Sequence, residues 1–311
     1  MKTKTNLSGV YVLIVFSMIF WGMSFVFSTI VLKYMDPFTI LFIRLFISCV
    51  FVWLLTVLFY RKYAVRLADL KILALLAFFE PFLYFIGETF GLQRVSPTIT
   101  ALIISTIPVF TAITMFVVYH VTLLKINIVG IALSFLGVVF MILGKDMEFV
   151  VDSVGLLLLF LAVFSAVCYG LVLTKVSSRI HPVWIISVQN TFSLLMFLPL
   201  MLIYGDPIRV EVVPEFHALS PQVELWGSLT VLAVFCSTLA FIFYTIAVKR
   251  IGITRTSIFT NLIPVITAIV SFLLLQEKMT VNKLVGMLII IGGVMLSQRK
   301  KKPESVKSIT N

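Results

Sequence analysis

The chain has 311 residues, of which 61% are hydrophobic and only 12% are charged, and its formal net charge is +11. Soluble globular domains contain roughly 25% charged residues and a smaller apolar share, so this composition excludes a soluble globular protein. It indicates an integral membrane protein.

Ten apolar segments follow one another along the chain, and short polar clusters separate them. Each is near 20 residues long, the length of helix that crosses about 30 Å of hydrocarbon, and a helix satisfies its own backbone hydrogen bonds there. The predicted spans are residues 9–32, 37–59, 70–91, 97–118, 125–143, 154–174, 182–204, 224–247, 255–275 and 281–298. The sequence therefore predicts an all-α integral membrane protein with ten transmembrane helices.

Basic residues are distributed unevenly between the loops on the two sides. With the N-terminus placed in the cytoplasm, 17 Lys and Arg residues fall inside and 6 fall outside, while Arg44 lies within a span. The inside set is Lys2, Lys4, Arg61, Lys62, Arg66, Lys71, Lys125, Lys175, Arg179, Lys249, Arg250, Arg255, Arg299, Lys300, Lys301, Lys302 and Lys307; the outside set is Lys33, Arg94, Lys145, Arg209, Lys278 and Lys283. This bias follows the positive-inside rule and predicts a multi-pass protein of the plasma (inner) membrane with both termini cytoplasmic.

The net positive charge has the same explanation. The basic tail "RKKKP", which starts at Arg299, is expected to anchor the last helix at anionic lipid headgroups, and no nucleic-acid partner is expected. Cys49, Cys168 and Cys236 fall within spans and form no CxxC pair, so neither a metal nor another cofactor is predicted. The predicted partners are a small-molecule substrate, the lipid bilayer and protons as a candidate coupling ion, and the expected state is a monomer or homodimer.

The two halves of the chain are similar to each other. When residues 94–138 are aligned with 250–294 without gaps, 14 of 45 positions are identical, including Pro108 with Pro264. Each half holds five predicted spans, and because five is odd the second half enters the membrane from the opposite side, as in many transporters. The predicted domains are a first five-helix repeat at 9–144, a second at 153–298 and a basic cytoplasmic tail at 299–311.

Pro108 and Pro264 stand in repeat-related positions, about 11 residues into their spans. At 1.5 Å per residue this is ~16 Å, near the middle of the membrane. Each proline removes a backbone N–H and interrupts helical hydrogen bonding. Transporters place their sites at such interrupted helices, so we expect both prolines to act as hinges; a kink that serves only helix packing is the alternative.

These features resemble the EamA-type drug/metabolite transporter superfamily. The similarity covers residues 9–298 and rests on "P-V-x-T-A-I" in the fourth helix of each half, on glycine-rich fifth helices, on "WG" in helix one and on "LLQEKMT" after helix nine. It implies a secondary transporter with a central cavity, and a family that includes exporters of amino acids and other small metabolites. The third span, "FFEPFLYFIGETFG", is more acidic than the family pattern and is a candidate for encoding the particular substrate.

Helix three supplies the acidic candidates for a substrate site. Glu80 and Glu88 are eight residues apart and share a broad helical face with Tyr84. Glu80 is expected ~14 Å from one face of the membrane and Arg44 ~12 Å from the other, so the two can meet at similar depth. Because a charge at the membrane centre costs about 2.5–3.5 kcal/mol, they are either a structural ion pair or a site where cargo and protons bind. A cargo carboxylate would then compete for Arg44.

Polar residues of the other helices complete the predicted site. In the second half these are Gln189, Asn190, Tyr244 and Asn261, with Asn261 either donating to a substrate carboxylate or satisfying backbone freed by the proline. In the first half Trp21 is expected either to wall the cavity or to pack between helices.

Two other classes of function are less well supported by the sequence. An intramembrane enzyme needs a nucleophile–base pair or metal ligands, and neither HExxH nor GxSxG occurs. A membrane receptor has no evident need for an inverted repeat. A proton- or ion-driven exporter without its own ATP site is therefore the predicted function.

The charge bias generates a testable topology. A Val212→Cys variant should react with a membrane-impermeant thiol reagent added to intact cells, whereas Ser305→Cys should react only after the cells are opened. The unsubstituted protein, whose cysteines all lie within predicted spans, is the control. The reverse labelling pattern would overturn the assignment of inside and outside.

Overall fold

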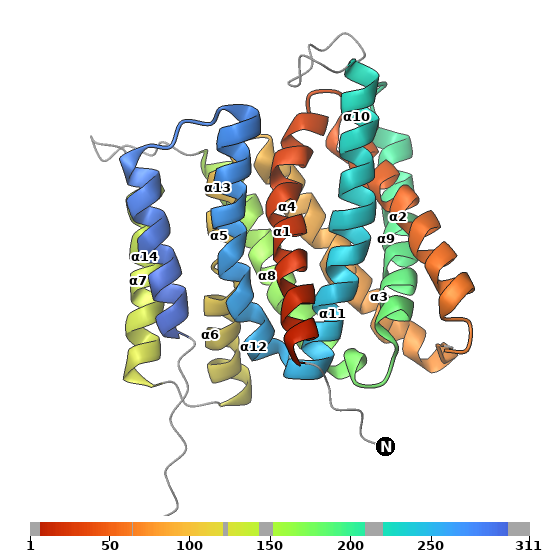
Figure 1. The fold of residues 1–311 in the computed structure, drawn as a ribbon, viewed down its shortest axis with the longest axis horizontal. Coiled ribbons are helices and arrows are strands. Elements are labelled where there is room, and N and C mark those ends of the chain that lie inside the picture. Colours follow the sequence, from red (N-terminus) through yellow and green to blue (C-terminus); the bar gives the residue numbers. More distant parts are fainter. Residues whose placement is uncertain (1–6, 64, 121–123, 143–151, 209–219, 298–311) are drawn as a thin grey trace, which may run out of the picture.

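The computed structural model describes residues 7–63, 65–120, 124–142, 152–208 and 220–297. Every regular element in these ranges is a helix (Figure 1). The α-helices are α1 (Leu7–Val31), α2 (Pro37–Phe59), α3 (Leu70–Ala77), α4 (Tyr84–Leu92), α5 (Pro97–Ile104), α6 (Ile107–Tyr119), α7 (Lys125–Ile142), α8 (Ser153–Ser177), α9 (Pro182–Tyr204), α10 (Pro221–Thr230), α11 (Ala240–Ile251), α12 (Ile253–Ser257), α13 (Leu262–Leu275) and α14 (Val281–Ser297). The predicted tail at 299–311 lies outside the described residues.

Within the described ranges, eight helical segments are long and apolar enough to cross a membrane, and each contains 21 to 31 residues. Shorter apolar segments occur at Lys125–Val138 and Val281–Ser297, in α7 and α14. The chain is therefore a multi-pass membrane protein. Helices occupy all ten ranges that the sequence marks as spans, but that α7 and α14 cross the membrane stays a prediction.

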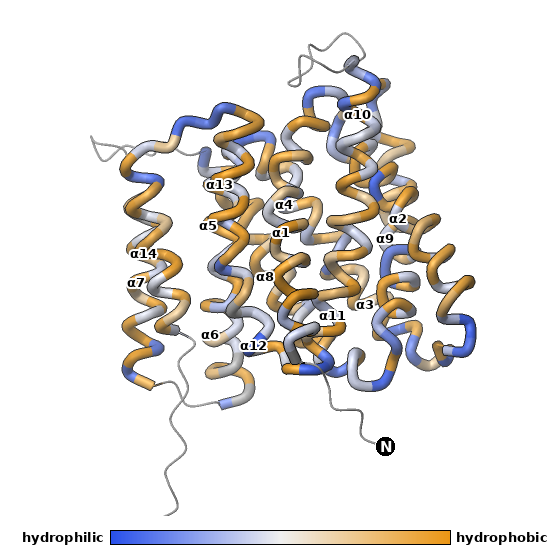
Figure 2. The backbone as a smooth tube through the Cα atoms, in the orientation of Figure 1, coloured by the Kyte–Doolittle hydropathy of each residue, from blue (hydrophilic) through white to orange (hydrophobic). Residues whose placement is uncertain are grey.

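The surface of the helical array is apolar in a band between two polar ends (Figure 2). Large side chains such as Phe59, Leu202 and Phe272 are exposed on the helices, whereas hydrophilic residues gather at the two ends of the molecule (Figure 2). α1 begins and α14 ends at the same end (Figure 1). An exposed apolar band of this extent is unfavourable in water and favourable against lipid, so the band marks the membrane-embedded part.

Helix starts are encoded by proline and by capping side chains. Proline occupies the first helical position of α2, α5, α9 and α10, where its missing N–H leaves no bond unmade. The Asp36 carboxylate accepts hydrogen bonds from the backbone N–H groups of Phe38 and Thr39 at 2.9 and 3.1 Å. Such a cap satisfies the free donors of a helix N-terminus, and it fixes where α2 enters the apolar band.

Four of the long helical segments are interrupted. A π-helical turn at Phe78–Leu83 joins α3 to α4, and another at Val231–Leu239 joins α10 to α11. A turn at Ser105–Thr106 separates α5 from α6, and a 3₁₀ turn at Ile258–Asn261 separates α12 from α13. When the two interruptions of the first half are shifted by 156 residues, each overlaps an interruption of the second half.

Both prolines directly follow such an interruption. Pro108 is the second residue of α6 and Pro264 the third residue of α13. A proline at the start of a helix is compatible with helical geometry, so each lies at a junction between two helical pieces rather than within a continuous helix. The junctions agree with the expectation of an interrupted helix, while the hinge role stays a prediction.

α7 and α14 form a close pair through glycine. A Cβ at Gly293 would lie 2.5 Å from the backbone N of Ser134, and one at Gly137 would lie 2.9 Å from the backbone N of Ile290. The Ser134 hydroxyl donates to the Ile290 carbonyl at 3.4 Å across the same contact. Small residues allow helix backbones to approach each other in this way.

Polar side chains tie segments together at the end opposite the termini. The Tyr34 hydroxyl donates to Glu224 of α10 at 2.9 Å. Glu277, in the loop after α13, accepts from the Thr98 hydroxyl at 2.7 Å and from Lys283 at 2.8 Å. Burial by itself would raise the pKa of Glu277, but the hydrogen bonds and the Lys283 charge outweigh it and hold that pKa below its usual value.

The neighbouring residues Gly292 and Gly293 allow a matched test of this packing. A Cβ at Gly292 meets nothing within 4 Å, whereas one at Gly293 clashes with backbone atoms of α7. Gly293→Ala should therefore lower the melting temperature of the purified protein. Gly292→Ala should leave it unchanged or raise it, because alanine favours a helix by about 0.5–1 kcal/mol over glycine. Equal melting temperatures for the two variants would contradict the close packing of α7 on α14.

Candidate functional site

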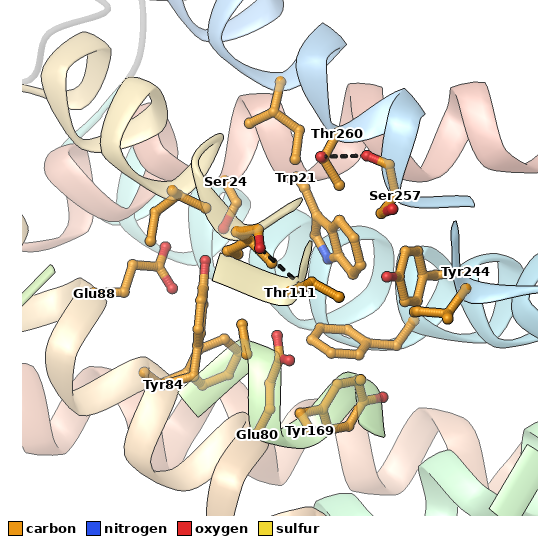
Figure 3. Close-up of a pocket in the computed structure, with 18 of the residues that line it drawn as sticks. Trp21, Ser24, Glu80, Tyr84, Glu88, Thr111, Tyr169, Tyr244, Ser257 and Thr260 are labelled. Atoms are coloured by element: carbon orange, nitrogen blue, oxygen red, sulfur yellow. Dashed lines mark hydrogen bonds between the residues drawn. The ribbon is translucent and has the colours of Figure 1, made fainter. Parts of the chain in front are cut away.

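A cavity lies among the helices and is lined by residues of both halves of the chain (Figure 3). We call it the central cavity. It leaves about 90 Å³ for the centres of water-sized molecules, which is room for several waters. Its wall reaches Ile253 and Ser257 of α12, and α12 lies at the same end of the molecule as the N-terminus (Figure 1).

Many wall residues are paired between the halves. Positions 156 residues apart line the cavity together: Phe85 with Phe241, Glu88 with Tyr244, Ile104 with Thr260, and Ile107 with Ile263. Trp21 and Tyr169, which occupy matching places in "FWG" and "CYG", also line it. The two halves therefore contribute equivalent surfaces to one cavity.

Glu80 reaches the cavity because the helix is broken beside it. The backbone of Glu80 is extended, with φ −146° and ψ 122°, inside the π-helical turn. The next residue is Pro81, and a proline disfavours helical geometry in the residue before it. The Glu80 side chain is 7% exposed and points toward the space between Tyr84 and Tyr244 (Figure 3).

Arg44 of α2 is almost wholly buried, with 1% of its surface exposed. Its Nε donates to the Ser237 hydroxyl at 2.6 Å and its Nη2 to the Ser24 hydroxyl at 3.3 Å. The guanidinium carbon lies 4.1 Å from the centre of the Phe85 ring, an arrangement in which a cation is attracted to an aromatic face. Contacts from three other segments thus fix the orientation of Arg44.

The expected pairing of Arg44 with Glu80 is not found. Among the residues that the structure describes, Arg44 makes no ion pair with a carboxylate, and its electrostatic neighbour on α4 is Glu88. The physical reason is that Ser24, Ser237 and the Phe85 ring hold the guanidinium away from Phe78–Leu83, the π-helical turn that carries Glu80. Equal depth in the membrane does not place two side chains on facing sides of their helices.

Aromatic rings form much of the remaining wall. The rings of Trp21 and Phe241 are 5.1 Å apart and edge-on, and those of Trp21 and Tyr244 are 4.9 Å apart. The Tyr169 ring lies 6.3 Å from that of Phe241. Such contacts favour fixed relative orientations, so the wall presents a preformed aromatic surface beside Glu80.

The structure brings six of the predicted binding residues to this cavity: Trp21, Arg44, Glu80, Tyr84, Glu88 and Tyr244. Three others lie elsewhere. The Asn190 amide donates to the Ser48 hydroxyl at 2.8 Å and so joins α9 to α2, Gln189 lies beside the Tyr169 hydroxyl behind the wall, and Asn261 is next to the lining residue Thr260 without lining the cavity itself. Whether any of these residues binds cargo stays a prediction.

Some wall residues were not singled out from the sequence. Phe241 could have been found by extending the 156-residue shift to Phe85, and Tyr169 by matching "FWG" with "CYG", where the shift is 148 residues. Ser24 and Ser237, which bind Arg44, carry no comparable signal because isolated serines are common in apolar helices. Within the described ranges no group of three His, Cys, Asp or Glu residues could hold a metal ion.

Comparison with known proteins gives a family for this fold and cavity. The profile of the EamA-like transporter family matches residues 8–143 and again residues 153–298. The chain belongs to that family, and it is a membrane transporter.

Several relatives are similar over most of their length. The chain is 26% identical to an uncharacterized transporter of Archaeoglobus fulgidus over 305 residues, which cover 97% of this chain and 99% of the relative. It is 25% identical to the uncharacterized transporter YvbV of Bacillus subtilis over 312 residues, covering 99% and 96%. Over 238 residues it is 26% identical to the uncharacterized transporter YyaM of the same organism, covering 76% and 73%.

A solved crystal structure shares the fold. It superposes with a TM-score of 0.66 at 12% sequence identity and covers 93% of this chain and 98% of the other. At this level of identity the likeness concerns the fold alone.

The contacts of Arg44 generate a stability prediction. Arg44→Ala leaves a void and leaves Glu88 without its basic neighbour, which should cost about 2–5 kcal/mol and lower the melting temperature of the purified protein. Ser237→Ala removes one acceptor and should cost less. Adding Glu88→Gln to Arg44→Ala should recover part of the loss, because it removes the unbalanced charge. An Arg44→Ala protein as stable as the parent would contradict this account.

Proposed function

We propose that this transporter exports small metabolites across the plasma (inner) membrane by secondary active transport, using the central cavity in an alternating-access cycle. The observation that carries the proposal is a cavity inside the membrane-embedded band whose wall is built from equivalent residues of the two halves. Binding near mid-membrane, between similar halves, allows one site to face each side in turn.

Several observations support an inverted repeat of two five-helix halves at 9–144 and 153–298. The family profile matches the chain twice, once in each half. α1 packs against α11 and α13, while its counterpart α8 packs against α4 and α6. With ten spans, each half could take the conformation of the other, and the junctions before Pro108 and Pro264 are where we place the hinges.

The proposed direction of transport, out of the cell, depends on which end of the molecule faces the cytoplasm. The cavity wall reaches α12, at the end of the molecule where α1 begins (Figure 1). If the basic loops face the cytoplasm, as the positive-inside rule predicts, the cavity wall extends toward the cytoplasmic end, which supports loading of cargo from inside. Loading from the cytoplasm is what an exporter requires.

Glu80 is the proposed proton-binding group. It is the most exposed of the three charged side chains on the cavity wall. The titratable groups around it are Glu88 and Tyr84 on its own segment, Tyr169 of α8 and Tyr244 of α11. A carboxylate that binds either cargo or a proton, but not both, links the two fluxes without an ATP site.

An intramembrane enzyme or a receptor is the alternative. The relatives are transporters by description, which favours transport over chemistry. Neither alternative moves a solute across a sealed membrane, so a transport measurement separates the classes.

Transport is testable in liposomes that contain the purified protein and a trapped pH-sensitive dye. Adding candidate cargo outside should change the internal pH faster in liposomes that contain the parent protein than in protein-free liposomes. Glu80→Gln mimics the protonated acid, which is the form that does not hold cargo, so it should exchange labelled cargo more slowly than the parent and should no longer respond to a pH gradient.

Two results would count against the proposal. If no amine, amino acid or other small metabolite moves through the parent protein, the transport function fails. If Glu80→Gln keeps the full response to the pH gradient, Glu80 is not the coupling group, and Glu88 is the next residue to substitute.

A further inference from the structure

The charges on the central cavity wall do not balance. Its charged residues are Arg44, Glu80 and Glu88, so when all are ionised the wall carries one net negative charge. Arg44 is held by Ser24 and Ser237, and its field acts on Glu88. Glu80 is thereby left as the negative charge without a basic neighbour, and its carboxylate accepts no hydrogen bond from the residues that the structure describes.

Aromatic rings surround this carboxylate. Tyr84, Tyr169 and Tyr244 are close enough to Glu80 to interact with its charge, and Trp21 packs against Tyr244 at 4.9 Å between ring centres. Figure 3 shows these four rings arranged around the space into which Glu80 points. The face of an aromatic ring attracts a cation, most strongly where water is excluded. The carboxylate and the rings therefore favour the same kind of ligand group.

We infer that the cargo of the central cavity is an organic monocation, meaning an amine or a quaternary ammonium group on an apolar body. The ammonium group lies against the Glu80 carboxylate and between the faces of the surrounding rings. This inference rests on the proposed transport function, since it names the chemistry of the cargo that the same cavity carries.

A cargo that depends on its own carboxylate fits the cavity less well. Such a group needs a free basic partner, and the basic residue of the wall is Arg44, which is 1% exposed and donates to Ser24 and Ser237. The Nη1 atom of Arg44 is buried and has no hydrogen-bond partner among the described residues, but the guanidinium packs against the Phe85 ring, so a carboxylate could reach Nη1 only by disturbing this packing. For an amino acid, the unfavourable free energy of placing its carboxylate in the cavity would therefore offset much of the favourable binding free energy of its ammonium group.

The rest of the wall suits an apolar body. Phe25, Ile104, Ile107 and Ile263 line the cavity together with Leu171. Contact with these side chains removes apolar surface from water without requiring specific hydrogen bonds. Glu80 and the aromatic rings would thus recognise the charge of the cargo, and the aliphatic residues would contact its apolar body.

Four compounds with one phenyl body test the charge preference: phenethylamine, phenylalanine, 3-phenylpropionate and 2-phenylethanol. Their binding to the purified full-length protein is measured by titration calorimetry. The amine should bind at least about tenfold more tightly than the zwitterion, the anion or the neutral alcohol. Glu80→Gln should remove that preference while leaving the affinity for 2-phenylethanol unchanged, and Glu80→Asp should retain part of it.

Matched controls keep this test independent of folding. Glu224→Gln alters a buried acid outside the cavity that accepts from Tyr34, and it should bind the amine as the parent does. If Glu80→Gln fails to fold, Trp21→Leu takes its place and should weaken the amine more than 2-phenylethanol. Binding of the anion or zwitterion as tight as that of the amine, no binding of the amine, or amine binding unaltered by both substitutions would overturn the inference.

Transport of the same compounds in liposomes separates this inference from the proposed function. Glu80-dependent binding of the amine without transport would contradict the transporter and leave the cation preference standing. Transport of phenylalanine or 3-phenylpropionate that does not depend on Glu80 would contradict the cation preference and leave the transporter standing.

Discussion

The cost of placing charge in an apolar medium governs this structure. A lone ion inside a membrane is unfavourable by several kcal/mol, yet the chain places Arg44, Glu80 and Glu88 around one cavity. The guanidinium is compensated by two serine hydroxyls, an aromatic face and the nearby Glu88. Glu80 has no such compensation from the described side chains. An uncompensated charge at a cavity wall is a stability cost that function can explain, because a ligand or a proton would supply the missing partner.

The similarity of the two halves accounts for the rest of the site. Repeat-related residues such as Phe85 and Phe241 both line the cavity, and α7 contacts α14 at positions 156 residues apart. The two halves differ at the positions of the acidic residues. Cys236 and Tyr244 occupy the positions that match Glu80 and Glu88. Among the described residues of the two halves, only those of the first therefore contribute charge to the cavity wall.

Much of the helical architecture and part of the site could be predicted from the sequence. Apolar runs and N-terminal prolines have direct geometric consequences, so the helix ranges followed from them. Residue depth was also a fair guide for Arg44 and Glu80, since it placed them at similar height and both line the cavity. The partner of Arg44 could not be predicted in this way. Which side of a helix faces a neighbouring helix depends on the rotation of the helix about its axis. For α2, contacts of Arg44 with Phe85, Ser24 and Ser237 accompany that rotation, and no local sequence pattern encodes them.

The central claim is that one cavity serves both sides of the membrane in turn. Thr111 lines the cavity, and among the residues that the structure describes its hydroxyl bonds only to the Ile107 carbonyl of its own helix, at 2.9 Å, so a cysteine there disturbs little. The decisive measurement is the rate at which Thr111→Cys, in a protein whose native cysteines are replaced by alanine, reacts with an impermeant thiol reagent added to either side of oriented proteoliposomes. The account predicts reaction from both sides, slowed from both by bound cargo. Reaction from one side alone under every condition, with or without cargo and a pH gradient, would contradict it.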